Sequence, residues 1–277
     1  MQQVLPDGDA IETALALAVP APSIRNTQPW RWRIGDGAVH LFLDPERATT
    51  SAERDAVLSC GAALHHLRVA FAALGWSAVV RRLPDPADPG HLAAVELVRH
   101  RPTKLDAALS AAISCRQSDR RPFASSPIQS GYVTLATERA GGLGAVVRLA
   151  TGPARDRLIE AAWLAMGRPA EPRDRVDEAE LLVVGTAADD RLSRLRAGEA
   201  MSAVLLTAAN VGLATCPLTE TLESARARRK LLGYTANPQV IIRIGRALDV
   251  AEPLPFTSRR GVDDVLETRA CEEGAYR

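Results

Sequence analysis

The chain has 277 residues, of which 47% are hydrophobic and 24% charged, and its formal net charge is +1. These values are typical of a soluble globular protein with one large or two small domains. Positive charge is spread along the chain instead of forming a stripe, and only 4% of the residues are aromatic. The composition therefore argues against a nucleic-acid-binding protein, which needs a basic surface or a row of stacking aromatic side chains.

The sequence contains no pattern for export, for a membrane span or for a metal site. Residues 1–19 carry acidic side chains and no basic stretch ahead of the apolar run, unlike a signal peptide. No run of about 18 apolar residues could span a membrane. The four cysteines lack C-x-x-C spacing and the five histidines lack an H-E-x-x-H pair, so we expect neither a disulfide framework nor a metal centre. We expect a cytoplasmic protein.

The first half of the sequence predicts helices and strands in a clear order. Apolar residues at helical spacing predict a first helix, which Pro20 and Pro22 end. A hairpin is predicted to turn at Gly35-Asp36-Gly37, and a long helix rich in small residues is stopped by Gly75. The predicted elements are a helix at 9–19, hairpin strands at 31–34 and 39–43, a helix at 55–74 and a strand at 91–98.

The second half repeats this order. Gly198 and Gly212 bracket an apolar helix at the same separation as Gly61 and Gly75. Each helix lies between two strand-like segments. The repeat predicts an internal duplication, in which the two long helices pack against each other at the centre of one α+β unit. Chance similarity between two Ala-rich helices is the alternative. The flanking strand-like segments are 39–44 and 91–98 in the first half, and 181–186 and 239–244 in the second.

The halves would be residues 1–110 and 111–277, which together form one compact unit. Between the repeated segments, residues 167–180 are rich in proline and charge and are predicted to be an exposed linker.

A cluster of cations lies at Cys115-Arg116-Gln117-Ser118-Asp119-Arg120-Arg121-Pro122-Phe123. Arg116, Ser118 and Arg120 alternate, so on an extended backbone they converge on one side. They would offer two guanidinium groups and a hydroxyl to a dianionic group such as a phosphate. Each charge-assisted contact would contribute roughly 1.5–3 kcal/mol. The alternative is a solvated basic turn ahead of a proline.

Three other segments could complete a phosphate site. Residues 22–30 form a polar loop that contains two prolines. Residues 212–220 are a helix stop followed by an extended turn with free backbone N–H groups. Residues 257–261 precede a short helix predicted at 262–267. Separately, each segment would more often be a helix cap, a solvated basic turn or an aromatic anchor of the core.

Together these segments resemble the FMN-dependent nitroreductase family, and most closely the Acg-like nitroreductases of actinobacteria, in which two nitroreductase-like halves are fused in one chain. The resemblance covers nearly the whole length and rests on the order and spacing of its motifs. These motifs are Ala21-Pro22-Ser23 with Asn26 and Gln28-Pro29-Trp30, the Arg116/Ser118/Arg120 cluster, residues 212–217, and Arg259 ahead of Val262-Asp263-Asp264-Val265.

The resemblance implies the fold and the number of cofactor sites. In ordinary members the flavin lies at a dimer interface, where one subunit supplies the basic cluster and the late arginine and the other supplies the APSxxN loop. This chain has each part once. We therefore expect a nitroreductase-like α+β fold, built as an internally duplicated pseudo-dimer with central long helices flanked by mixed or antiparallel sheets. One chain would build one complete FMN site.

The resemblance also implies roles for individual residues, none of which is a catalytic side chain, because FMN carries the hydride. Cys216 is expected to be a small buried hydrophobe and not a nucleophile. The phosphate would be held by Arg116, Ser118, Arg120 and Arg259. Ser23 and Asn26 would contact the ribityl chain or the ring edge, with Pro22 fixing the approach. Pro217 would belong to the cofactor-binding turn, and the backbone N–H groups around Leu218 and Thr219 would face flavin N5.

Two departures from the family affect what is implied. The segment between the halves is shorter than in the Acg-like relatives, which puts a lid over the flavin in doubt, and Gly261 stands where a proline is frequent. No G-x-G-x-x-G follows a strand, so NAD(P)H is expected to bind only transiently, over the flavin.

The expected function is hydride transfer from NAD(P)H through FMN to a nitro-aromatic or quinone-like small molecule. The alternatives are an FMN storage protein with little turnover, and an FMN dehydrogenase acting on a heterocyclic or peptide-like metabolite. We expect a monomer, with a homodimer as the alternative, and neither a nucleic acid nor a membrane as partner.

Overall fold

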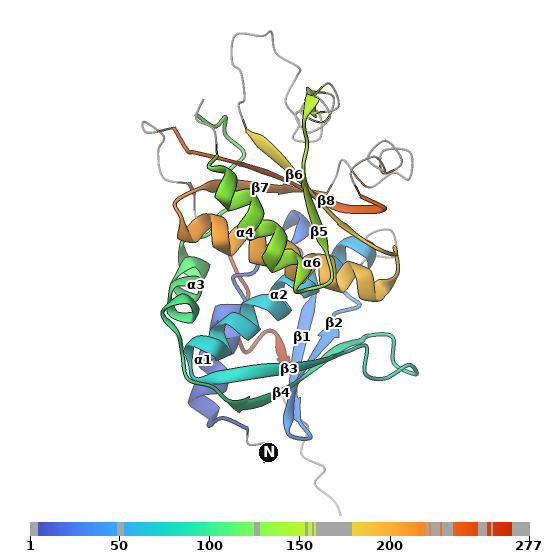
Figure 1. The fold of residues 1–277 in the computed structure, drawn as a ribbon. Helices are drawn as coiled ribbons and strands as arrows, with labels where there is room; N and C mark the ends of the chain where they lie inside the picture. Colours follow the sequence, from blue (N-terminus) through green and yellow to red (C-terminus); the bar gives the residue numbers. More distant parts are fainter. Residues whose placement is uncertain are drawn as a thin grey trace, which may run out of the picture.

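The computed structural model describes residues 5–48, 53–124, 128–152, 155–156, 158, 179–219, 222, 228, 235–248, 254–255 and 257–267. Within them the fold is α+β, as predicted, with long helices between two sheets (Figure 1). Helices α1 (Gly8–Ala18), α2 (Glu53–Ala73), α3 (Lys104–Cys115), α4 (Ser130–Gly141) and α6 (Arg191–Asn210) are accompanied by a 3-10 turn, η1 (Ile24–Asn26).

The first sheet, sheet A, has the strand order β3-β4-β2-β1-β9, and the second, sheet B, has the order β5-β6-β8-β7. Strand β9 runs parallel to β1, and every other pair of neighbouring strands is antiparallel. The strands are β1 (Trp30–Gly35), β2 (Ala38–Leu43), β3 (Trp76–Arg82), β4 (His91–Arg99), β5 (Val146–Leu149), β6 (Glu180–Thr186), β7 (Ala214–Leu218), β8 (Asn237–Gly245) and β9 (Leu266–Glu267).

Local sequence explains the start of the fold. Asp7 caps α1 by accepting a hydrogen bond from Ala10 N at 2.9 Å, and the apolar stripe of the helix is buried. The predicted hairpin is β1–β2, with Asp36 and Gly37 at φ of 51° and 73°. Two-residue hairpin turns require such positive φ angles, which glycine adopts without strain. The predicted first helix and the predicted hairpin are both confirmed.

The two long helices form the centre of the molecule. Helix α2 packs on sheet A, α6 packs on sheet B, and the helices pack on each other. At their crossing, a Cβ on Gly61 would lie 2.1 Å from the carbonyl oxygen of Leu195, and a Cβ on Gly198 would lie 1.9 Å from that of Leu58. Backbones approach this closely only where no side chain intervenes. Gly61 lies inside α2, as in the helix predicted at 55–74, whose small residues suit close packing. Gly198 does not mark a helix end, because α6 already begins at Arg191 and the crossing requires a glycine at position 198.

Polar side chains also join the two helices. His65 Nδ1 lies 2.9 Å from Ser202 Oγ, 137 positions along the chain. Glu199 of α6 is fully buried and accepts hydrogen bonds at 2.7 Å from both Arg68 of α2 and Arg82 of β3. The crossing is therefore fixed by a close backbone contact and by a buried ion-pair network.

The described elements repeat one order. The first set is α1-β1-β2-α2-β3-β4, and the second is α4-β5-β6-α6-β7-β8. Sheet A without β9 reads β3-β4-β2-β1, and sheet B reads β7-β8-β6-β5, which is the same order of equivalent strands. This agreement supports the internal duplication, which stays a prediction. Helix α3 lies between the two sets, so the proposed boundary after residue 110 falls within it.

The prediction of a short helix at 262–267 was wrong. Val265 N and Leu266 N both donate to Val262 O, which forms a single helical turn. The chain then pairs with β1 as β9, and Trp32 N donates to Val265 O at 2.7 Å. A six-residue helix gains little from its own hydrogen bonds, whereas pairing satisfies the free edge of β1. Most of the predicted linker at 167–180 lies outside the described residues.

Helix α2 is the described helix whose length and composition would suit a membrane span, but 78% of its most apolar window is buried within the protein. This is the environment of a core helix, and it agrees with the position of α2 between sheet A and α6.

Candidate functional site

Arg116 lies buried at the end of α3. This helix begins with a capping box in which Thr103 and Asp106 satisfy each other's backbone N–H groups. It ends where Arg116 N donates to Ala112 O at 2.9 Å. The side chain turns inward and is 6% exposed, and its NH2 group reaches Pro20 O at 3.5 Å. Its Nε and NH1 atoms have no partner in the part of the chain that the structure describes.

Arg259 brings a second guanidinium group close to Arg116. Its NH1 donates to Asn26 Oδ1 at 3.0 Å, and its buried Nε has no partner among the described residues. Burial, together with the positive charge of Arg259, lowers the pKa of Arg116 to about 10. Burial also lowers the pKa of Arg259. No described carboxylate pairs with either cation, so the arrangement lacks an anion.

His66 of α2 belongs to the same buried cluster. Burial holds its pKa well below the usual value, and the charges of Arg116, His65 and Arg259 add to this effect. The Leu17 carbonyl faces the ring and favours its protonated form, but neither ring nitrogen reaches hydrogen-bonding geometry with a described residue. The ring is therefore neutral. Sequence reasoning missed His66, because a histidine in an apolar helix has no motif around it.

The loop at residues 21–29 lies against Arg259. Arg25, Asn26 and Gln28 have φ of 52°, 56° and 50°, a left-handed conformation that costs non-glycine residues on the order of 1 kcal/mol or more. Ser23 Oγ accepts from Gln28 N at 3.0 Å, and Ser59 Oγ accepts from Ile24 N at 3.2 Å. These contacts hold the loop in its strained form.

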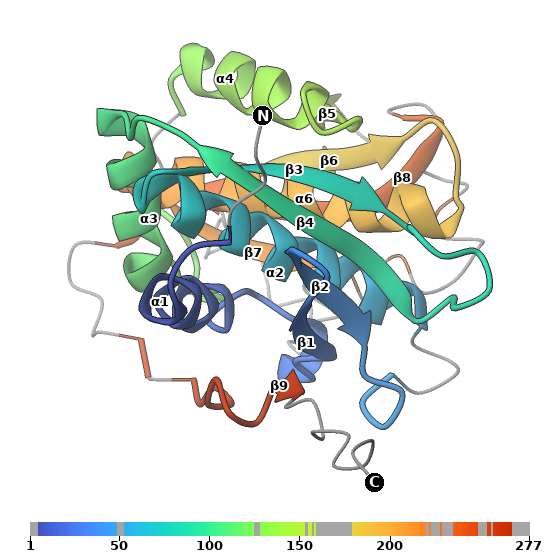
Figure 2. The same ribbon diagram turned by 90° about the horizontal axis from the view of Figure 1, so that it is seen from below.

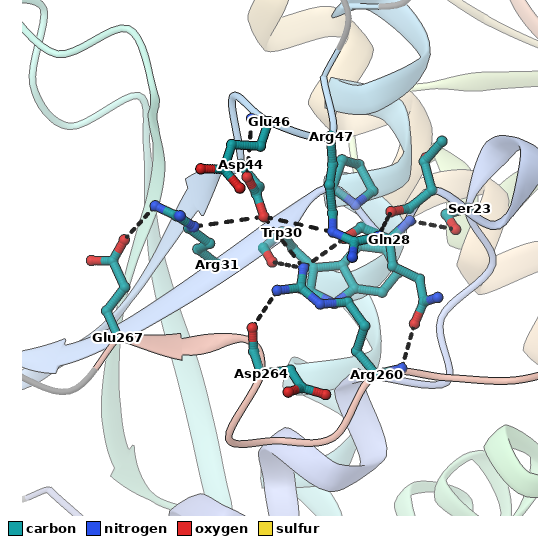
Figure 3. Close-up of polar contacts among 12 residues, drawn as sticks. Ser23, Gln28, Trp30, Arg31, Asp44, Glu46, Arg47, Arg260, Asp264 and Glu267 are labelled. Carbon is teal, nitrogen blue, oxygen red and sulfur yellow. Dashed lines mark hydrogen bonds and ion pairs between the residues drawn. The ribbon is translucent and has the colours of Figure 1, made fainter.

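A network of charges surrounds this loop (Figure 3). Asp44, at the end of β2, is 2% exposed and lies within 4 Å of three guanidinium groups: 3.4 Å from Arg260, 3.6 Å from Arg31 and 3.9 Å from Arg47. Arg31 also reaches Glu267 of β9 at 3.4 Å. The network joins the first hairpin to the C-terminal segment.

The rest of the predicted basic cluster lies along the free edge of sheet B. Asp119 N donates to Thr215 O at 2.8 Å, and Ser118 forms a parallel bridge with Thr215. Phe123 is buried against Gly245, which leaves no room for a Cβ there. Ser118 and Arg120 are exposed. The structure thus groups Arg116 with Arg259 and Asn26.

The residues predicted to face flavin N5 lie in strand β7 and at Thr219, directly after it. The Thr215 carbonyl of β7 points to the free edge, where Asp119 binds it. Because backbone groups alternate along a strand, those of Leu218 turn towards Ile241 of β8, its partner in the ladder. Continued alternation would put the Thr219 N–H on the free side, which makes Thr219 the better candidate. Pro217, which has no N–H, suits the free edge. Glu220 lies outside the described residues.

The described residues give little support to a cysteine nucleophile or to a metal site. Cys216 is 1% exposed, as expected of a small buried hydrophobe. Among the described residues no group of three or more histidine, cysteine or acidic side chains could hold a metal ion. A cavity of about 330 Å³ lies at the β1–β2 turn and contains none of the predicted site residues. It is lined by Arg33, Gly35, Asp36, His40, Phe42, Asp85, Asp88 and His91.

Solved structures of nitroreductases resemble this chain only weakly. A Bacteroides fragilis nitroreductase with bound FMN matches at 16% identity and a TM-score of 0.44, covering 55% of this chain and 95% of that one. The FMN-dependent nitroreductase NfnB from Mycobacterium smegmatis, in complex with NADPH, matches at 19% identity and a TM-score of 0.41, covering 63% of this chain and 99% of that one.

Curated sequences match far more closely. The Mycobacterium tuberculosis protein named "Putative NAD(P)H nitroreductase Rv3131" is 39% identical over 96% of this chain and 94% of its own length. Another from that organism, "Putative NAD(P)H nitroreductase acg", is 36% identical over 95% and 96%. The alignment with the first spans 324 positions, so that relative has residues that this chain lacks. The model of the nitroreductase family matches residues 136–246. The chain therefore belongs to the nitroreductase family of oxidoreductases.

Proposed function

We propose that this protein is an FMN-dependent oxidoreductase that takes electrons from NAD(P)H and delivers them to a small organic acceptor, such as a nitro-aromatic compound or a quinone. The proposal rests chiefly on the buried guanidinium group of Arg116 and the half-buried one of Arg259, whose unpaired nitrogens face no described carboxylate. Two such forks suit a phosphate dianion. The names of the relatives support NAD(P)H as the donor.

Different residues of the site would bind different parts of FMN. Arg116 and Arg259 would hold the FMN phosphate, and Ser118 and Arg120 would approach it from the free edge of sheet B. Asn26 would contact the ribityl chain or the ring edge. Ser23 would act mainly by bracing the loop, since its hydroxyl already accepts from Gln28 N, and buried Pro22 would fix the entry to that loop.

Bound FMN would supply the hydride-transfer chemistry, for which the described residues of the site offer no side chain. The protein would supply electrostatics: a backbone N–H of Thr219 near N5 would stabilise negative charge there. Because His66 is neutral, it would add no further positive charge beside the two arginines when no phosphate is present. No protein nucleophile is needed.

The site would combine the loop with Asn26, from the first set, with Thr219, which follows β7 of the second set. Arg116 and Arg259 would come from α3 and the C-terminal segment, which lie outside both sets. We propose on this basis that the chain is an internally duplicated pseudo-dimer with one FMN site, and that it is a monomer in the cytoplasm. The repeated strand order of the two sheets supports the duplication.

The test is reduction of the FMN-loaded protein by NADPH or NADH without oxygen, followed by steady-state nicotinamide oxidation with a quinone or a nitro-aromatic acceptor. We expect the flavin absorbance to bleach and the oxidation rate to rise with acceptor. A storage protein would bleach slowly or not at all and show no turnover. FMN that neither nicotinamide reduces would contradict the proposal and favour either FMN storage or a dehydrogenase for a heterocyclic or peptide-like metabolite.

A further inference from the structure

Arg260, the neighbour of Arg259, makes more contacts than a solvated side chain would. Its backbone N donates to Gln28 Oε1 at 2.8 Å. Its NH1 reaches Gln28 O at 3.2 Å and Asp44 Oδ2 at 3.4 Å, and its NH2 donates to Asp264 O. The side chain is 15% exposed. Figure 3 shows these contacts converging between the first hairpin and the C-terminal segment.

Gln28 transmits this anchoring to the loop of the flavin site. It is 5% exposed and has a positive φ of 50°. Its N–H is taken by Ser23 Oγ, and its Nε2 donates to Asn26 O at 3.3 Å. Because Gln28 connects Ser23 and Asn26 to Arg260, the position of the strained loop depends on the C-terminal segment.

The same segment fixes Arg259. Asn26 Nδ2 donates to Ser258 O at 3.1 Å while Asn26 Oδ1 accepts from Arg259 NH1. On the other side of Arg260, Gly261 N donates to Asp264 Oδ2 at 2.9 Å, and the chain continues into β9 on sheet A. Figure 2 shows this segment, in red, running past α1 to β9 beside β1. Arg259 is therefore held by the hydrogen bond of its side chain to Asn26 and by the contacts that anchor the next residue, Arg260.

We propose that Arg260 is a positioning residue of the flavin site, which locks the C-terminal segment to Gln28 and Asp44 and thereby sets Arg259 at the phosphate. The proposal rests on the proposed function and extends it. Arg260 itself does not touch the phosphate, because its guanidinium is occupied by Gln28, Asp44 and Asp264. Its effect on FMN binding passes through Arg259.

The test compares the affinities of FMN and riboflavin, measured by quenching of flavin fluorescence. Riboflavin lacks the phosphate, so the ratio of the two affinities reports the phosphate contacts alone. We expect Arg260→Ala to lower this ratio by about tenfold or more, which is the effect of a misplaced charge-assisted contact. Arg259→Ala should lower it similarly, and Arg260→Ala should add nothing in the Arg259→Ala background.

Arg47→Ala is the matched control. Arg47 contacts Asp44 at 3.9 Å and Thr27 O at 3.2 Å, so it shares the network and touches the loop, but no hydrogen bond or ion pair joins it to the described residues 257–267 of the C-terminal segment. We expect an unchanged ratio. Gln28→Asn is a second variant in case Arg260→Ala does not fold. Asparagine tolerates a positive φ, but its shorter side chain cannot reach Arg260 N, so the ratio should fall again.

The outcomes separate the two proposals. Wild-type protein that binds neither flavin overturns both. Wild-type protein that prefers FMN, together with an unchanged ratio in folded Arg260→Ala or Gln28→Asn, overturns the role of Arg260 alone. A further fall of the ratio when Arg260→Ala is added to Arg259→Ala also overturns it, because Arg260 would then contact the phosphate itself.

Discussion

Arg116 and Glu199 are both buried charged side chains, but their surroundings differ. Glu199 accepts hydrogen bonds from Arg68 and Arg82, whereas Arg116 has one contact with a backbone carbonyl and two nitrogens without partners among the described residues. A buried charge with partners holds a structure together, and one without partners costs stability. The first belongs to the core and the second to a binding site.

Replacing these charges should therefore have opposite effects. We expect Arg116→Met to raise the free energy of unfolding of the FMN-free protein by about 2 kcal/mol, since the lowered pKa of Arg116 shows that burial disfavours its charge. Arg82→Met should lower it by about 3 kcal/mol, because Glu199 loses a partner. Urea unfolding of both variants measures the two changes. Equal destabilisation would show that Arg116 is part of the structural core.

At this scale the sequence predicted part of the site. Arg116, Arg259 and Asn26 lie in short motifs with the residue types that bind phosphate, and the structure brings them together. His66, Asp44 and Arg260 were not identified. Their roles arise from contacts between segments far apart in the chain, such as Arg260 with Gln28, and no local pattern marks such contacts.

Among the helices and strands, the crossing of α2 and α6 should be the place most sensitive to substitution. A Cβ at Gly61 would overlap the backbone of α6, which is fixed at this point by the ion pairs of Glu199. We expect Gly61→Ala to lower the free energy of unfolding by about 3 kcal/mol or more. Gly131→Ala in α4 is the matched control, because a Cβ there meets nothing within 4 Å.

The control should be neutral or stabilising by about 0.5–1 kcal/mol, since alanine favours a helix. Thermal unfolding of both variants measures the difference. Similar melting temperatures would mean that the helices do not cross at Gly61.

Elements with strong periodicity were predictable and those defined by their partners were not. The apolar spacing of residues 9–19 identified α1, and the apolar runs identified β4, β6 and β8. Helix α3 was missed although Thr103 and Asp106 form a capping box, and β3 and β7 were missed because each follows a helix after a very short turn. The segment that contains β9 was predicted to be helical, but its pairing with β1 makes it a strand.

The whole molecule should lose stability in mild acid. Burial, helped by Arg68 and Arg139, lowers the pKa of His65 to about 3, and burial lowers that of His66. The unfolded chain takes up protons below a pH of about 6.5, and the folded chain does not, so stability falls as the pH falls. For His65 the loss between pH 7 and pH 5 is about 2 kcal/mol.

Urea unfolding of FMN-free protein across this range measures the slope. His65→Gln should make the slope shallower, whatever its effect at pH 7. An unchanged slope would show that His65 is protonated in the folded protein.

The two repeated sets should unfold together. Helices α2 and α6 bury each other's surface, and their crossing carries the Glu199 ion pairs. We expect a single calorimetric transition whose calorimetric and van't Hoff enthalpies agree. Two transitions would mean that residues 1–110 and 111–277 are independent domains.

The most direct measurement is a titration of the purified protein with FMN, followed by visible absorbance and by sedimentation of the complex. We predict one FMN per chain in a monomer, binding much tighter than riboflavin, and a large loss of affinity for FMN in Arg116→Met. A colourless protein that takes up no FMN, or FMN binding that Arg116→Met leaves unchanged, would contradict this prediction.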